Sequence, residues 1–244
     1  MYCTTVSIYF VLLILHAHTS QTWHIRAPRG VLTEKVERQA PAASGGPSPP
    51  FKTLTITPDK ATVLNSCAYT VYIKSVPGGL QGDCPDGGPL ATIKSGATWS
   101  EKASRCGNGN TALKVYGKNP EEYGYDQQTN PVMQFEYGKT DNTMWYDLSF
   151  INCKDTPVES TSNDPGLHSC VGWKEGVQLG AGGGCRIAKC APRGKCCKTS
   201  YCDPLGTAAR VETGNEPTLG CTPSEAGMAF DDMGLTAELC AGNL

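Results

Sequence analysis

The sequence of 244 residues lacks the patterns that several classes of protein require. No window shows a sustained helical period, and no apolar run reaches the roughly 20 residues of a transmembrane helix. No CxxC motif occurs, and only His24 and His168 lie beyond residue 20, whereas structural zinc sites use closely spaced Cys and His pairs. These absences argue against helical domains, transmembrane helices and zinc clusters, and we expect neither metal nor cofactor.

The chain also lacks a broad excess of positive charge. Residues 61–244 carry 15 basic and 20 acidic side chains, a net charge of −5, so they lack the basic surface that nucleic acid binding requires. Residues 185–198 are a local exception, with five basic residues and no acid. This basic segment fits a solvated loop, or alternatively a surface that recognises an anionic ligand.

Cysteine is abundant, and twelve of the thirteen cysteines lie beyond residue 20. The apolar run Ile8–Leu15 fits a signal-peptide core, so residues 1–20 are expected to be removed near Ser20. A buried strand or helix is the alternative, since no Lys or Arg precedes the run. Export would leave an even number of cysteines in an oxidising compartment, which predicts six disulfides.

Composition divides the remaining chain into three parts. Residues 21–60 are predicted to be a largely disordered linker or propeptide, because QAPAASGGPSPP offers almost nothing to bury, and folding should begin near Phe51. Alternating runs such as TALKVYG, PVMQFEYG and TMWYDLSFIN predict half-buried strands within residues 61–152. Residues 153–244 are predicted to form a disulfide-rich, loop-dominated lobe. The expected fold is an all-β antiparallel β-sandwich with Greek-key-like connections.

Several motifs, taken in order, resemble the thaumatin-like protein family, in a divergent form typical of fungi. These are LNSCAYTVYIKSV, ATWSEKA, TALKVYGKN, VMQFEYGKTDNTMWYDLSFIN and the cysteine pattern of GGGCRIAKCAPRGKCCKTSYCDP. The glycines before Cys185 are expected to permit a tight turn. The resemblance covers residues 61–240 and implies a flattened β-sandwich, a disulfide-rich lobe and a cleft between them.

The resemblance also implies a set of disulfides, although the family usually has more cysteines than this chain. The implied pairs are Cys67–Cys240, Cys84–Cys106, Cys153–Cys185, Cys170–Cys221, Cys190–Cys196 and Cys197–Cys202.

Plant relatives line their cleft with one Arg, one Glu and three Asp, and the cleft is thought to bind β-1,3-glucan, sometimes with weak glucanase activity. The matching positions here are Lys114, Gln134, Asp147 and Asn152, with the last near Asn215 or Glu216. Only Asp147 keeps the family's residue type.

Hydrolysis of a glycoside ordinarily needs two carboxyl groups about 5 to 9.5 Å apart. The catalytic candidates are therefore Asp147 with Glu136 or Glu216, and Glu136 should face the same side as Gln134 but lie further along the strand. A structural role is the alternative for Asp147, because such residues often accept backbone hydrogen bonds. Lys114 could equally be an ordinary solvent-facing strand residue.

Aromatic residues could stack on sugar rings or fill the core, and about half should be core. They are Trp99, Tyr116, Tyr123, Tyr125, Tyr137, Trp145 and Tyr146.

The leading hypothesis is a secreted, monomeric and non-catalytic protein that binds cell-wall polysaccharide, such as β-glucan, or another component of a cell surface. The second is a weak endo-β-1,3-glucanase that uses the carboxyl candidates above. The third is a secreted antigen or effector whose partner is another protein. Each places the mature protein outside the cell or in the cell wall.

Overall fold

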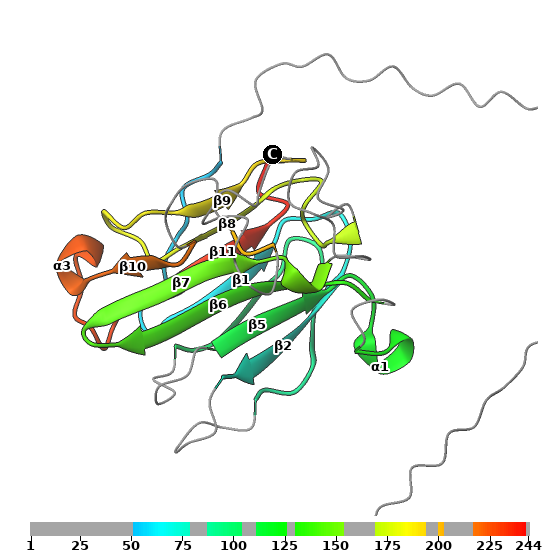
Figure 1. Ribbon diagram of the computed structural model, residues 1–244, viewed down its shortest axis with the longest axis horizontal. Coiled ribbons are helices and arrows are strands. Elements are labelled where there is room, and N and C mark those ends of the chain that lie inside the picture. The colour runs from blue at the N-terminus through cyan, green and yellow to red at the C-terminus, as the bar shows by residue number, and fades with distance from the viewer. Residues whose placement is uncertain are drawn as a thin grey trace, which may run out of the picture. The chain divides into compact units, whose positions relative to one another are not determined.

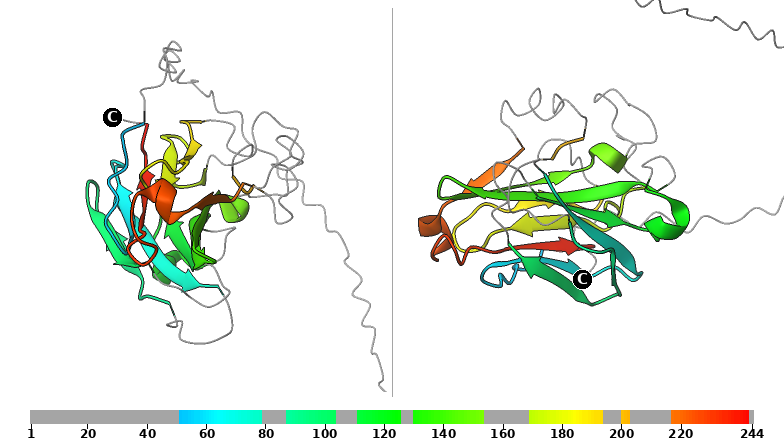
Figure 2. Two further views of the ribbon diagram at one scale, coloured as in Figure 1. Left: turned by 90° about the vertical axis from the view of Figure 1, so that its left-hand side faces the viewer. Right: turned by 90° about the horizontal axis from the view of Figure 1, so that it is seen from below.

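A computed structural model describes residues 51–78, 87–103, 111–125, 130–153, 169–193, 200–202 and 217–242. Two β-sheets lie one upon the other (Figures 1 and 2), as the alternating sequence predicts. The α-helices of the described ranges, α1 (Pro120–Tyr123) and α3 (Pro223–Ala226), are one turn long, and η1 (Ile151–Cys153) is a 3-10 turn. No helix within these ranges is long and apolar enough to cross a membrane.

The first sheet has six strands in the order β10-β7-β6-β5-β2-β3, and all neighbours in it are antiparallel. Its strands are β2 (Val71–Pro77), β3 (Ala91–Ile93), β5 (Thr111–Tyr116), β6 (Val132–Thr140), β7 (Thr143–Ser149) and β10 (Leu219–Cys221).

The second sheet has five strands in the order β4-β1-β11-β8-β9. Its strands are β1 (Lys60–Asn65), β4 (Thr98–Lys102), β8 (Val177–Gly180), β9 (Ala188–Cys190) and β11 (Leu235–Leu239). β1 and β11 run parallel, and the other neighbours are antiparallel. β8 and β9 come from the part of the sequence that was expected to form the lobe, because pairing with β11 buries Val177 and Leu179.

A tight hairpin joins β6 to β7 at the centre of the six-stranded sheet. Its two turn residues, Asp141 and Asn142, have φ values of 50° and 57°, the left-handed conformation that Asp and Asn tolerate best. Thr140 therefore pairs with Thr143, and every later pair along the two strands follows from this register.

The core between the sheets consists of the inward-facing side chains of both. Phe135 pairs with Leu113 on one side and Leu148 on the other, and all three are fully buried. The largest buried side chains are Tyr137, Tyr146, Phe135, Phe150, Ile73, Ile93, Leu113, Met133, Met144, Leu148 and Leu179. This core confirms the predicted all-β sandwich.

Residues 51–57 lie against the five-stranded sheet without joining its ladder. The carbonyl of Lys52 accepts a hydrogen bond from Gln178 Nε2 at 2.9 Å, and that of Thr55 accepts one from Thr236 Oγ1 at 2.8 Å. Leu54 and Ile56 are half-buried, whereas Thr55 between them is exposed. This part of the predicted linker is therefore ordered on the sandwich, because it buries alternate apolar side chains.

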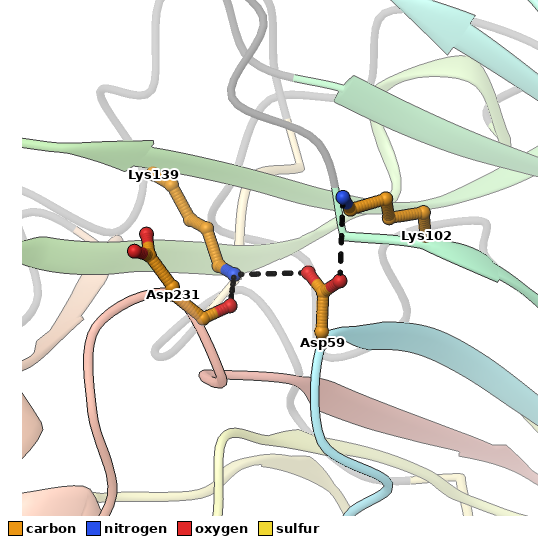
Figure 3. Close-up of polar contacts among 4 residues, drawn as sticks. All are labelled: Asp59, Lys102, Lys139 and Asp231. Carbon is orange, nitrogen blue, oxygen red and sulfur yellow. Dashed lines mark hydrogen bonds and ion pairs between the residues drawn. The ribbon is translucent and has the colours of Figure 1, made fainter.

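A buried lysine joins the six-stranded sheet to the turns that precede β1 and β11 (Figure 3). Lys139 of β6 has a side chain only 1% exposed, with Nζ 3.6 Å from Asp59 Oδ1 and 3.1 Å from the carbonyl oxygen of Asp231. The other carboxylate oxygen of Asp59 lies 3.6 Å from Nζ of Lys102, whose side chain is 75% exposed. The lysine clamp, formed by Lys139, Asp59 and Asp231, thus satisfies a charge within the sandwich.

One implied disulfide is confirmed. Cys67, after β1, is joined to Cys240, after β11, where these parallel neighbours end side by side. Cys190 and Cys202 are also in disulfides. The expected pairs Cys84–Cys106, Cys190–Cys196 and Cys197–Cys202 each include a cysteine outside the described residues.

The implied pairs Cys153–Cys185 and Cys170–Cys221 are wrong, because their partners are exchanged. The disulfides instead join Cys153 to Cys170 and Cys185 to Cys221. Ser169 Oγ donates to the Cys153 carbonyl at 3.1 Å, which places Cys170 beside Cys153.

Cys185 meets Cys221 because the glycine turn before it packs on α3. The Gly184 N–H donates to the Glu225 carbonyl at 2.7 Å, and a Cβ on Gly183 would lie 2.4 Å from the Ala226 carbonyl oxygen. Glycine is therefore required in this turn, where Gly183 also has a φ of 55°.

Candidate ligand-binding site

The six-stranded sheet has one face on the core and an opposite face, here called the outer face, that carries polar side chains. Along β6, Phe135 points into the core, so Gln134 and Glu136 point outward. Strand register adds their neighbours to the same face, with Lys114 opposite Gln134 and Asp147 opposite Glu136. The outer face is defined by Lys74, Lys114, Gln134, Glu136, Asp147 and Ser149.

Two carboxyl groups meet at the centre of the outer face. Glu136 and Asp147 are direct cross-strand partners, and their side chains are hydrogen-bonded to each other. Asp147 is 5% exposed, and its Oδ2 accepts a hydrogen bond from Thr218 Oγ1 at 3.3 Å. The Thr218 hydroxyl lies 3.0 Å from that of Tyr201. We call Glu136 and Asp147 the acid pair.

The acid pair holds a proton at neutral pH. Burial, the charge of Glu136 and the hydrogen bond between the two carboxyls raise the pKa of Asp147 to about 8, against the smaller effect of Thr218. Burial also raises the pKa of Glu136, while contacts with Asp147 and Ser149 and the charge of Lys114 act in the other direction. Asp147 therefore remains protonated when Glu136 is ionised, and it can donate the hydrogen bond between them.

The other cleft residues implied by the resemblance also lie here, where they are described. Gln134 Nε2 donates to Asn152 Oδ1 at 2.9 Å, so η1 is fixed against β6. Lys114 is half-buried beside Gln134. Glu216 and Asn215 lie outside the described residues. Lys114, Gln134, Glu136, Asp147 and Asn152 thus gather on one side of the sheet.

Thr218 and Tyr201 complete the surroundings of Asp147 but could not be found from the sequence. Both come from the cysteine-rich half, where no strand pattern indicates a position. Tyr201 reaches β7 through a single parallel bridge to Ser149, and Thr218 precedes the short strand β10. Only the folded chain brings them to the acid pair.

The aromatic residues divide between core and surface. Tyr137 and Tyr146 are fully buried, Tyr116 is 3% exposed, and Trp99 packs partly buried against the core. Trp145, Tyr123 and Tyr125 are 40%, 49% and 47% exposed. Trp145 lies on the outer face, two residues from Asp147.

A separate hollow of about 300 Å³ lies away from the acid pair. It is lined by the turn between β1 and β2 at Tyr69, by Lys118 after β5, by Asn130 before β6, and by Ser169 and Glu175. No member of the outer face lines this hollow, so the two are distinct candidate sites.

Comparison with solved structures finds two similar proteins. The protein elicitor MoHrip2 from Magnaporthe oryzae is 23% identical, with a TM-score of 0.47, and the match covers 75% of this chain and 99% of that one. The thaumatin-like xylanase inhibitor TLXI is 13% identical, with a TM-score of 0.41, and the match covers 74% of this chain and 98% of that one.

No curated protein matches the chain. The resemblance to thaumatin-like proteins agrees with the observed sandwich at the level of the fold. The family itself follows from a sequence match over residues 51–202 to the model of the Blastomyces yeast-phase-specific proteins. Since this match spans more than half of its length, the chain belongs to the Bys1 family of Blastomyces yeast-phase-specific proteins.

Proposed function

We propose that the protein is exported and binds a neutral cell-wall polysaccharide, such as β-glucan, on the outer face without hydrolysing it. The observation that supports this most directly is the acid pair, whose two carboxyl groups are hydrogen-bonded to each other and partly covered.

Contact between the two carboxyls argues against hydrolysis. A glycosidase holds its carboxyls about 5 Å or more apart, with the scissile bond or an attacking water between them. Here Glu136 and Asp147 occupy each other's hydrogen-bonding positions, and Thr218 takes a further oxygen of Asp147. Gln134 and Asn152 replace the other carboxylates and can serve neither as acid nor as nucleophile.

The charges on the outer face favour a neutral ligand. Lys74 and Lys114 supply two positive charges, Glu136 supplies one negative charge, and Asp147 stays protonated at neutral pH. Mixed donors and acceptors of this kind suit sugar hydroxyls, which both donate and accept hydrogen bonds. A polyanion would meet Glu136 at the centre of the site.

Disulfides support a location outside the cell. The described residues contain bonds Cys67–Cys240, Cys153–Cys170 and Cys185–Cys221, and such bonds persist in oxidising compartments. Together with the apolar N-terminal run, they support export and a position in or near the cell wall.

Retention on insoluble β-glucan tests the proposal. We expect the wild type to be retained and to release no reducing ends from laminarin, and we expect Lys114→Ala and Glu136→Ala each to weaken retention about tenfold. Lys102→Ala, an exposed lysine of the other sheet, is the matched control and should be retained like the wild type. Failure of the wild type to bind would contradict the proposal and favour a protein partner.

A weak endo-β-1,3-glucanase is the second candidate, because the raised pKa of Asp147 suits a general acid. This candidate requires that laminarin be hydrolysed and that Asp147→Asn abolish the activity. Such a result would replace the binding-only proposal.

A further inference from the structure

We infer that the binding site is an elongated strip between two aromatic platforms, Trp145 and Tyr125, and that it binds an internal stretch of a linear polysaccharide. This inference rests on the proposed function and adds to it the form of the ligand and two residues that select it. A monosaccharide or a chain end would use only one part of the strip.

Trp145 forms the first platform because its neighbours on the outer face are glycines. In the strand register it lies opposite Gly138 of β6 and Gly220 of β10. A Cβ on Gly220 would lie 2.8 Å from Cζ3 of the indole, so the ring rests over the backbone of β10. With no side chain on either flank, 40% of this residue stays exposed beside the acid pair.

Tyr125 forms the second platform, at the opposite end of β6. Its ring centroid lies 5.9 Å from that of Tyr116 at an interplanar angle of 88°, and Nζ of Lys74 lies 5.1 Å above it. Tyr116 and Lys74 both belong to strands of the outer face, so they position Tyr125 over this face. The tyrosine is 47% exposed, although two neighbours hold it in place.

The register of β6 gives the length of the strip. Gly138 lies opposite Trp145, and Val132 lies opposite Tyr116, the contact of Tyr125. These positions face the same side and are six residues apart along one strand, or about 20 Å. Gln134 and Glu136 lie between them, so a ligand that touches both platforms crosses the acid pair.

The chemistry of the strip suits an extended sugar chain. The C–H face of a sugar ring packs on an aromatic ring, while the hydroxyls at its edge need polar partners. The strip offers aromatic rings at its ends and Lys114, Gln134 and Glu136 between them. Only a linear chain of several sugar units is long enough to use both ends at once, so affinity should depend on chain length.

The test measures binding of laminari-oligosaccharides, from the disaccharide to the heptasaccharide, to the full chain by calorimetry. We expect wild-type affinity to rise with length and then to level off once both platforms are spanned. Trp145→Ala and Tyr125→Ala should each weaken binding of the longest oligosaccharide about tenfold and abolish most of the length dependence. Disaccharide binding should change far less in at least one of the two variants.

Two further variants separate ring position from folding. Gly220→Ala keeps Trp145 but forces its ring to move, so binding of the long oligosaccharides should weaken here as well. Trp145→Phe should keep part of the affinity and lose the change in tryptophan fluorescence that the wild type shows on binding. Ile187→Ala removes an exposed apolar side chain from the loop before β9 and should bind like the wild type.

The outcomes distinguish the inference from the proposed function. If the wild type binds glucan but the variants keep its affinity and length dependence, the strip is wrong and the proposed function stands. If affinity does not increase beyond the disaccharide, the strip is also wrong. If the wild type binds no glucan at all, both are overturned.

Discussion

Asp147 is the residue whose surroundings depart furthest from those of an ordinary surface acid. Its carboxyl is 5% exposed, faces Glu136 and accepts a hydrogen bond from Thr218. Ionising both members of the acid pair would place two negative charges in contact where little water can screen them. The fold therefore keeps a proton on Asp147 at a pH where an exposed aspartate is fully ionised.

The proton on Asp147 should make stability depend on pH. The pKa of Asp147 is about 8 in the folded chain against an ordinary 3.8, so between these values the folded state binds a proton that the unfolded state releases. Stability from this group is therefore present below about pH 4 and lost as pH rises toward 8, by up to about 1.4 kcal/mol per pH unit. Urea unfolding of the wild type and Asp147→Asn from pH 4 to 8 measures the difference.

The variant should gain stability relative to the wild type as pH rises, because asparagine does not titrate. Other titrating groups contribute to both proteins and largely cancel in the comparison. Parallel pH profiles would show that Asp147 ionises normally.

At the scale of elements, the lysine clamp is one of the connections that hold β6 against the turns before β1 and β11 (Figure 3). Lys139 and Lys102 lie at the same 3.6 Å from Asp59, yet their side chains are 1% and 75% exposed. Equal distance with unequal burial makes the two lysines a matched pair.

We expect Lys139→Ala to lower the free energy of unfolding by about 2 to 3 kcal/mol, since it removes a buried stem and leaves the Asp231 carbonyl without this donor. Lys102→Ala should cost less than about 1 kcal/mol, because water screens an exposed pair. Guanidinium unfolding of the three proteins checks this order. Equal losses would mean that the burial of Lys139 adds nothing to the ion pair.

At the scale of the whole molecule, the disulfides differ most in the length of chain that they close. Cys67–Cys240 joins residues 173 apart and ties the first strand to the last, whereas Cys153–Cys170 closes 17 residues. A longer closed loop removes more freedom from the unfolded chain in the chain-entropy model.

Replacing both cysteines of a bond by serine should therefore cost more for Cys67–Cys240 than for Cys153–Cys170. The chain-entropy model gives about 5 and about 3 kcal/mol, with the first value reduced by the bonds that remain. Thermal and denaturant unfolding of the two double variants measures the order. A larger loss for the short loop would show that local packing outweighs chain entropy here.

Much of the outer face could be predicted from alternation alone. Lys114 alternates with Leu113 and Val115, and Gln134 with Met133 and Phe135, so their faces follow from the period of a strand. The pairing of Glu136 with Asp147 was expected less well, although a signal for it existed. A two-residue turn at Asp141 and Asn142 sets the register and places these two residues opposite each other.

Residues from the cysteine-rich half could not be predicted in the same way. Thr218 and Tyr201 reach Asp147 through short contacts with β7, and neither lies in a run with a clear period. The exchanged disulfides have the same cause. Cys185 pairs with Cys221 because the Gly184 turn packs on α3, a contact between segments about 40 residues apart.

The sequence by itself determined the class of fold, the strands at the centre of the six-stranded sheet and the dependence on disulfides. Periodicity, turn residues and cysteine count are local properties, and they survive in any single chain. The tertiary structure alone decided which cysteines pair, which half of the chain covers Asp147, and which aromatic rings stay exposed. These outcomes depend on burial and on contacts between distant segments, and burial is what raises the pKa of Asp147 and leaves the Trp145 ring open between two glycines.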